Sequence, residues 1–245
     1  METTLHRQLK LAFAGPKSKF EQRLGRYRID VVTGRRLIEI QHSSLAAIWR
    51  KCADLLELKH RLDIIKPLVM RKRLVKLTGP EGEIIDQRWS PYRGSIFDIF
   101  DELLYFRRVF PHPRLRLIVP LLDVEEIRYP GHGRRRRWRA NDFQVADRSY
   151  TTWHGCEVFE RAEDLVRLLP GELPPLWDTE MLARQAAVSR GVAQRVAYVL
   201  REVGAISQQA KRGNAWVYQQ VNSAKPGRRR KKAHSFPVGH SLPLS

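Results

Sequence analysis

The sequence predicts an α/β fold in which helices flank a mixed sheet, followed by a small helical domain and a basic tail. Two strand-like runs flank a turn at Gly34, a helical segment leads straight into a further apolar strand, and the composition changes at a proline-rich stretch beginning at residue 171. We therefore expect domains over 1–170 and 178–222, a linker over 171–177 and a disordered basic tail over 223–245.

The first elements that we expect are a helix and a strand hairpin, and the hairpin carries the polar residues discussed below. Residues 3–14 repeat apolar side chains at helical spacing and end at Gly15-Pro16, so we expect a helix there. Residues 27–32 and 36–41 are rich in β-branched and aliphatic residues, and Gly34 between them supplies the positive φ of a tight turn. These runs are expected to pair as a hairpin.

The hairpin carries acids in strands that are otherwise apolar. Asp30 lies in the first strand, and Glu39 and Gln41 lie two residues apart in the second, so Glu39 and Gln41 point to one face. Buried charges are costly unless they are paired or bind a metal. A register that brings Asp30 beside Glu39 predicts a site for a hard cation such as Mg²⁺, and the alternative is that both acids pair with nearby arginines.

The rest of the first domain is expected to extend the sheet. Residues 45–59 form a helix, and residues 63–69 form a strand parallel to the one that carries Glu39. The further expected elements are a hairpin of 70–77 with 83–89, a helix over 96–106, a core strand over 115–122 that Pro120 pushes to an edge or an end, and a helix over 160–169. The acids Asp123, Glu125 and Glu126 are expected to pair with nearby arginines rather than form a second carboxylate site.

This order of elements resembles the core of the PD-(D/E)XK nucleases. In that family an Asp precedes a hairpin strand bearing Glu-x-Lys or Glu-x-Gln, as Asp30 precedes Glu39-Ile40-Gln41 here. The Gln form is similar to the branch of CoiA-like competence nucleases, which tend to have a His-x-x-Leu-Lys helix near the start, matched by His6-Arg7-Gln8-Leu9-Lys10. Glu21 stands where the family typically has a Glu before the Asp strand.

The resemblance implies a restriction-endonuclease-like fold and a metal-dependent deoxyribonuclease, acting as an endonuclease or an exonuclease. Asp30, Glu39 and the Ile40 carbonyl would hold Mg²⁺ or Mn²⁺. The remaining catalytic candidates are Gln41 to orient the attacking water, Glu21 as a further ligand or support, and Lys51 to hold the phosphate. Gln41 replaces the commoner Lys and can only orient water by hydrogen bonding. A catalytically inactive DNA-binding regulator with this fold is therefore the alternative, and an RNA-directed nuclease is a third hypothesis.

The charge of the chain predicts a polyanionic partner. The formal net charge is +19, and DNA, duplex or branched, is the first candidate. No apolar run approaches the length that spans a bilayer, so no membrane partner is expected. Two cysteines and the lack of a secretory signal favour a cytoplasmic protein, associated with the nucleoid in a prokaryote or nuclear in a eukaryote. A homodimer is left open.

A basic loop is the first predicted nucleic-acid contact. Arg134, Arg135, Arg136 and Arg137 precede Trp138 in a segment flanked by glycines. Consecutive guanidinium groups beside an indole predict phosphate binding together with a stacking platform. The alternative is a solvated basic loop.

The second domain has the pattern of helix, turn, helix and basic hairpin. We expect helices over 178–186 and 189–203 and strands over 205–209 and 215–220. This order resembles a winged helix-turn-helix, and the alternative is a dimerisation or scaffold domain. The resemblance implies that Arg190, Gln194 and Arg195 face the major groove, while Lys211 and Arg212 reach the backbone or minor groove.

Overall fold

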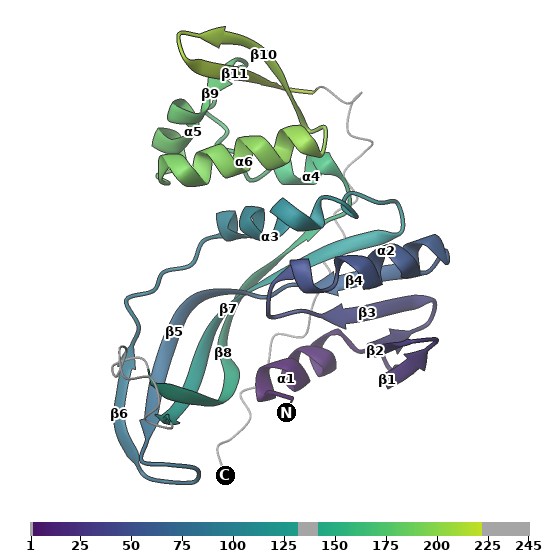
Figure 1. Cartoon of the computed structure of the whole chain (residues 1–245), viewed down its shortest axis with the longest axis vertical. Coiled ribbons are helices and arrows are strands. Elements are labelled where there is room, and N and C mark those ends of the chain that lie inside the picture. The colour runs from purple at the N-terminus through teal and green to yellow at the C-terminus, as the bar shows by residue number, and fades with distance from the viewer. Residues whose placement is uncertain (1, 132–141, 222–245) are drawn as a thin grey trace.

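The computed structural model describes residues 2–131 and 142–221. The predicted basic loop, Arg134 to Trp138, and the predicted tail over 223–245 lie outside the described residues. Within the described part, the chain has a large mixed sheet flanked by helices and a small separate sheet (Figure 1). The predicted mixed α/β architecture is therefore confirmed. No helix among these residues is long and apolar enough to cross a membrane.

The first half of the large sheet follows the predicted order. Three antiparallel strands come after helix α1, and the third strand pairs in parallel with the strand that follows helix α2. The bounds are α1 Thr4–Phe13, β1 Lys19–Leu24, β2 Tyr27–Thr33, β3 Arg36–Ile40, α2 Trp49–Glu57 and β4 Arg61–Ile65. Thr3 caps α1 by accepting from the His6 N–H, and Gly34 in the hairpin turn has φ +56°.

The second half of the sheet forms a long arm (Figure 1). Its strands are β5 Leu68–Leu77, β6 Ile84–Trp89, β7 Leu115–Pro130 and β8 Phe143–Phe159, and helices α3 Ile99–Phe106 and α4 Ala162–Val166 accompany it. Strand β7 pairs in parallel with β4 and then β5, and antiparallel with β8. The predicted parallel relation between β3 and β4 and the predicted β5–β6 hairpin are both confirmed.

Pro120 lies inside β7, not at an edge or an end, so that prediction is wrong. On one side β7 pairs with β4 up to Ile118 and with β5 from Leu121, so Pro120 falls in the gap between two partner strands. On the other side it lies opposite Cys156 of β8. Pro120 therefore has no paired residue on the β4–β5 side, where a residue without an N–H is tolerated.

Two hydrophobic cores cover the two faces of the sheet. Leu5 and Leu9 of α1 pack with Ile38 and Ile40 of β3, whereas the buried residues of α2 and α3 cluster with Leu37. Since successive residues of a strand point to opposite faces, α1 and α2 lie on opposite faces of β3. The acids of the hairpin are therefore placed between two helices.

The C-terminal unit consists of two main helices and a three-stranded sheet in the order β10-β11-β9. Its elements are β9 Trp177–Asp178, α5 Thr179–Gln185, α6 Arg190–Glu202, β10 Ile206–Arg212 and β11 Ala215–Gln220. Asp178 and Ser189 cap α5 and α6. Trp177, assigned to the linker from sequence, is buried and pairs with Tyr218, so the small sheet begins before residue 178.

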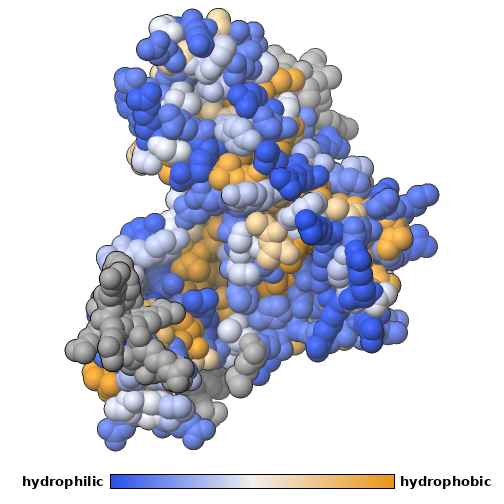
Figure 2. Space-filling model, viewed as in Figure 1, coloured by the Kyte–Doolittle hydropathy of each residue, from blue (hydrophilic) through white to orange (hydrophobic). Residues whose placement is uncertain are grey.

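The C-terminal unit packs on the first domain through α6 and α3. Apolar residues of both helices, among them Phe100 and Leu200, belong to one continuous core. Polar contacts frame this core, since Arg107 donates to the Tyr198 hydroxyl across 2.9 Å and Arg195 pairs with Asp101. Figure 2 shows a largely hydrophilic face with apolar residues gathered where the upper unit meets the sheet.

Candidate active site

Asp30 is held where β2 separates from β3. The two strands pair from Val31 with Ile38 onward, so Asp30 and Glu39 are the next residues beyond the last pair. Ile29 and Val31 are both buried but belong to the cores on opposite faces of the sheet. Residues two apart in a regular strand point to the same face, so the side chains of β2 change face at Asp30. This change of face leaves the Ile40 N–H free to donate to Asp30 Oδ2 across 2.8 Å.

The second oxygen of Asp30 meets the basic residues of α1. His6 Nε2 lies 3.2 Å from Asp30 Oδ1, and Lys10 Nζ lies 3.9 Å from the same atom. Burial alone raises the pKa of Asp30, but the His6 contact, the Ile40 N–H and the two positive charges outweigh it and leave the pKa below its ordinary value. Asp30 is thus ionised and oriented.

Glu39 contacts α2 on the other side of the sheet. Lys51 Nζ donates to Glu39 Oε1 across 2.5 Å and to the Arg28 carbonyl across 2.6 Å. Glu39 Oε2 is buried and makes no hydrogen bond to any described residue. Burial, then the charge of Asp30, raises the pKa of Glu39, and Lys51 offsets only part of this. Asp30 and Glu39 are adjacent at the end of the β2–β3 pairing, but their side chains contact helices on opposite faces of β3.

Lys10 connects Asp30 to two more acids. This buried lysine lies 2.8 Å from Glu2 and also pairs with Glu21. Glu21 has φ +53° and interrupts the pairing of β1 with β2, which turns its carboxylate toward Lys10 and Arg28. The alternative that the hairpin acids pair with basic side chains is met in part: among the described residues, Asp30 and Glu39 pair with His6, Lys10 and Lys51 rather than with arginines.

Gln41 points away from the carboxylates. Its side-chain amide donates to Ser43 Oγ across 2.6 Å and to the Ser44 carbonyl across 2.9 Å, so it holds the turn after β3. Lys66 reinforces this turn by donating to the Ser43 carbonyl across 2.6 Å. The next residue, His42, stands edge-on to His6 with ring centroids 5.8 Å apart. Sequence reasoning missed His42, although it directly follows the Glu-x-Gln motif.

The acids of β7 are occupied by cations, which confirms the prediction that they pair with neighbouring basic groups. Asp123 is fully buried and accepts from Arg71 across 2.6 Å, and His154 Nε2 lies 2.8 Å away. Glu125 lies 3.7 Å from Arg73, and Glu126 is bound by three basic side chains, Lys72, Arg128 and Arg148.

The C-terminal candidates divide into exposed and engaged residues. Arg190 and Gln194 are exposed near the start of α6, and Lys211 and Arg212 are exposed on the β10–β11 hairpin. Lys211 Nζ lies 4.9 Å from the ring centre of Trp216, which is itself exposed. Arg195 differs, because its guanidinium pairs with Asp101 of α3 at the contact between the two units.

The donor set around the hairpin suits a hard divalent cation. The described residues hold no group of three or more His, Cys, Asp or Glu side chains placed for a metal. Mg²⁺, however, is commonly held by one or two carboxylates with waters and substrate phosphates. The buried Glu39 Oε2 without a partner and its raised pKa are what a carboxylate lacking a cation would show. Glu39 therefore fits such an ion, and Asp30 could join it only at the strand end where the two residues are adjacent, because the partners of the two carboxylates lie on opposite faces of β3.

Comparisons with known proteins give a family but no activity. Residues 3–160 match the family described as Domain of unknown function (DUF8091). An uncharacterized protein of Treponema pallidum (strain Nichols) is 28% identical over 220 residues, which cover 89% of this chain and 85% of that protein. No solved structure gives a significant match.

Proposed function

The chain belongs to the family described as Domain of unknown function (DUF8091), and we propose that it is a metal-dependent deoxyribonuclease that hydrolyses phosphodiester bonds. The observation that carries the proposal is the pair of partly buried carboxylates, Asp30 and Glu39, at the point where β2 and β3 separate. Keeping two like charges within reach of each other costs stability, and a shared cation offsets this cost.

Asp30 and Glu39, with the Ile40 carbonyl as a further oxygen, would hold Mg²⁺ or Mn²⁺. Such an ion supplies a bound water of lowered pKa and neutralises charge that develops on the phosphate. His6 positions Asp30 from α1, and the Ile40 N–H fixes the other Asp30 oxygen. These contacts keep the carboxylate ionised, as ligation requires.

Two further side chains take roles toward the substrate. Lys51 of α2 already neutralises one Glu39 oxygen, so we assign to it the contact with the scissile phosphate. We assign Gln41 to holding the turn after β3, because both its amide contacts lie there. The water-orienting role expected for Gln41 is not part of this mechanism.

The proposal includes a restriction-endonuclease-like fold for the first domain and a winged helix-turn-helix for the C-terminal unit. The order of α1, the Glu21 strand, the Asp30–Glu39 hairpin and α2, with the helices on opposite faces, supports a restriction-endonuclease-like core. Helices α5 and α6 followed by the β10–β11 hairpin support a winged helix-turn-helix. The formal charge of +19 supports DNA as the substrate.

The test is cleavage of plasmid, linear, branched and single-stranded DNA with Mg²⁺ or Mn²⁺. We expect the wild type to cut at least one of these substrates, and Asp30→Asn and Glu39→Gln each to abolish cutting. Glu57→Gln, an exposed glutamate at the end of α2, serves as the matched control and should retain activity. Cutting that persists in both site variants would refute the assignment.

An inactive DNA-binding regulator is the second candidate. Two observations favour it: Lys10, His6 and Lys51 already neutralise the acids, and Gln41 cannot act as a base. In the same assay this protein would shift duplex DNA in gels and leave it uncut under every metal.

A further inference from the structure

One face of the arm continues the face of the sheet that α1 covers. Leu122 and Val124 of β7 share a core with Leu5 and Leu9 of α1. Glu126 follows Val124 at the strand period of two, so its side chain is expected on this face. The face therefore runs from the Asp30 site outward along β7.

Helix α1 is tied to β8 beside the start of this path. The Thr4 N–H donates to Asp147 Oδ1 across 2.8 Å, and the Tyr150 N–H donates to Gln8 Oε1 across 2.9 Å. Arg148 lies between these two anchor points in β8. Helix α1 also carries His6, which contacts Asp30, so Arg148 lies in the part of β8 that is anchored to the helix bordering the candidate active site.

A buried acid then orders the basic residues of the arm. Glu126 is 1% exposed and binds three cations from three strands: Lys72 at 3.2 Å, Arg148 at 2.7 Å and Arg128. Three positive charges on one negative charge leave an excess of two. The acid fixes the positions of these side chains, and the excess charge remains available to an anion.

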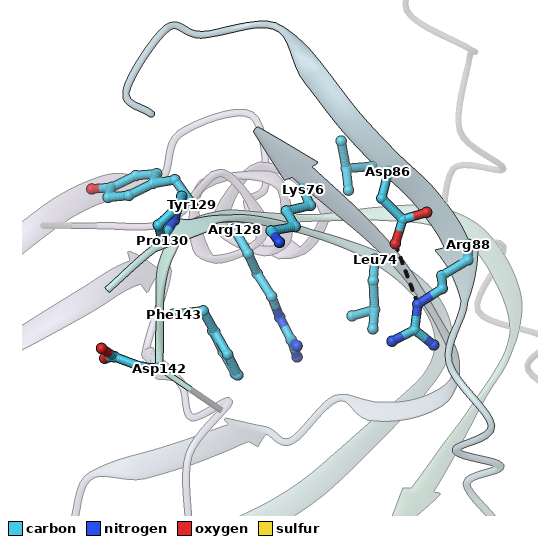
Figure 3. Close-up of a pocket in the computed structure, with 10 residues that line it drawn as sticks. Leu74, Lys76, Asp86, Arg88, Arg128, Tyr129, Pro130, Asp142 and Phe143 are labelled. Atoms are coloured by element: carbon cyan, nitrogen blue, oxygen red, sulfur yellow. Dashed lines mark ion pairs between the residues drawn. The ribbon is translucent and has the colours of Figure 1, made fainter. Parts of the chain in front are cut away.

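Beyond Glu126 the face opens into a pocket of about 400 Å³ between the β5–β6 and β7–β8 hairpins (Figure 3). Its lining includes Lys76, Arg88, Arg128 and Phe143, together with two acids, Asp142 and Asp86, of which Asp86 pairs with Arg88. The Arg128 guanidinium lies 3.8 Å from the ring centre of Phe143, and Figure 3 shows the two side chains alongside each other. Lys76 lies opposite Arg128 in the register of β5 with β7 and makes no ion pair with a described residue.

We infer that Arg148, Lys72, Arg128 and Lys76 form a basic track that binds the sugar-phosphate backbone of a nucleic-acid strand and leads it from the Asp30 site to the pocket of the arm. The inference deepens the proposed function, since it names the surface on which the substrate strand lies. Cations spaced along neighbouring strands suit a regularly charged chain better than a single small anion.

The test is DNA binding in the presence of a chelator, so that no cleavage occurs. Fluorescence anisotropy with labelled duplex and single-stranded DNA is measured over a series of salt concentrations, for the wild type, Lys76→Gln and the double variant Lys72→Gln/Lys76→Gln. Lys76 makes no ion pair with a described residue, whereas Lys72 is one of three cations on the buried Glu126, so thermal unfolding checks that each variant is folded. The matched control is Lys59→Gln, an exposed lysine after α2 that makes no ion pair with a described residue.

We expect Lys76→Gln to lower the magnitude of the slope of log K against log salt by about 0.9 on duplex DNA or about 0.7 on a single strand, and the double variant to lower it by about twice as much. Lys59→Gln should leave the slope unchanged. Equal slopes for wild type and double variant, or an equal loss in Lys59→Gln, would overturn the track. A failure of the nuclease proposal would instead appear as absent cleavage with these binding results intact.

Discussion

Lys51 of α2 donates to one oxygen of Glu39 across 2.5 Å, while the other Glu39 oxygen is buried without a hydrogen bond to any described residue. The carboxylate is thus half satisfied, and its pKa stays raised by burial and by the charge of Asp30 despite the lysine beside it. A half-satisfied buried acid costs stability, so the arrangement is better explained by a ligand than by the needs of the fold.

Glu39 should make folding less favourable as the pH rises. Its pKa in the folded protein is raised above 4.5, so the folded state holds its proton more tightly than the unfolded state. Stability then falls as the pH rises from 4.5 through the raised pKa, by about 1.4 kcal/mol for each unit of the shift. Urea denaturation without metal should show this fall in the wild type relative to Glu39→Gln. A difference between the two that stays constant with pH would contradict the prediction.

Asp30 should change the stability of the fold with pH in the opposite direction to Glu39. Its lowered pKa means that it contributes stability above the ordinary value of 3.8, and this stability is lost as the pH falls through the folded pKa. Asp30→Asn should cost about 1–3 kcal/mol at neutral pH, because His6 and Lys10 lose a charged partner. Chemical denaturation at neutral and acid pH measures this, and the cost should shrink in acid. Asp86→Asn, an exposed acid on β6, is the control and should change stability by at most about 0.5 kcal/mol.

The contact between α3 and α6 should make the two units unfold together. Leu200 of α6 is fully buried in the core that it shares with Phe100 of α3, so Leu200→Ala should cost about 2–5 kcal/mol. Leu58→Ala, at an exposed leucine, should cost little. Circular dichroism and tryptophan fluorescence should report one shared transition. Two separate transitions would show that the units are independent.

The β10–β11 hairpin should contribute to DNA affinity if the C-terminal unit is a winged helix-turn-helix. Lys211→Gln and Arg212→Gln should each lower the magnitude of the salt slope of duplex binding by about 0.9, because both residues are exposed on this hairpin. Arg195→Gln should change the slope less, since Arg195 already pairs with Asp101. Anisotropy titrations measure all three. A larger effect from Arg195 than from the hairpin would contradict this binding mode.

The local elements of the fold could be predicted from the sequence because their signals are local. Thr3, Asp178 and Ser189 cap helices where they stand before helical apolar patterns, and Gly34 marks the hairpin turn. The place of Pro120 inside β7 could not be predicted, because a proline is tolerated there only where two other strands, β4 and β5, meet on one side of β7. That meeting is a long-range property with no local signature.

Only part of the candidate site could be predicted, because its charged residues have a local signal in the sequence and their partners do not. Asp30 and Glu39 could be singled out because charges stand out in an apolar hairpin, but their partners come from α1 and α2. The change of face in β2 at Asp30 and the positive φ of Glu21 decide toward which face of the sheet each acid points. Gln41 shared its spacing with Glu39, yet the turn after β3 redirects it to Ser43 and Ser44.

The central claim is that Asp30 and Glu39 hold one divalent cation together. Calorimetric titration of the metal-free protein with Mn²⁺ tests it without reference to any substrate. We predict one site in the wild type, weakened about tenfold or more by either Asp30→Asn or Glu39→Gln and unchanged by Glu57→Gln. Equal Mn²⁺ binding by the wild type and both site variants would contradict the account.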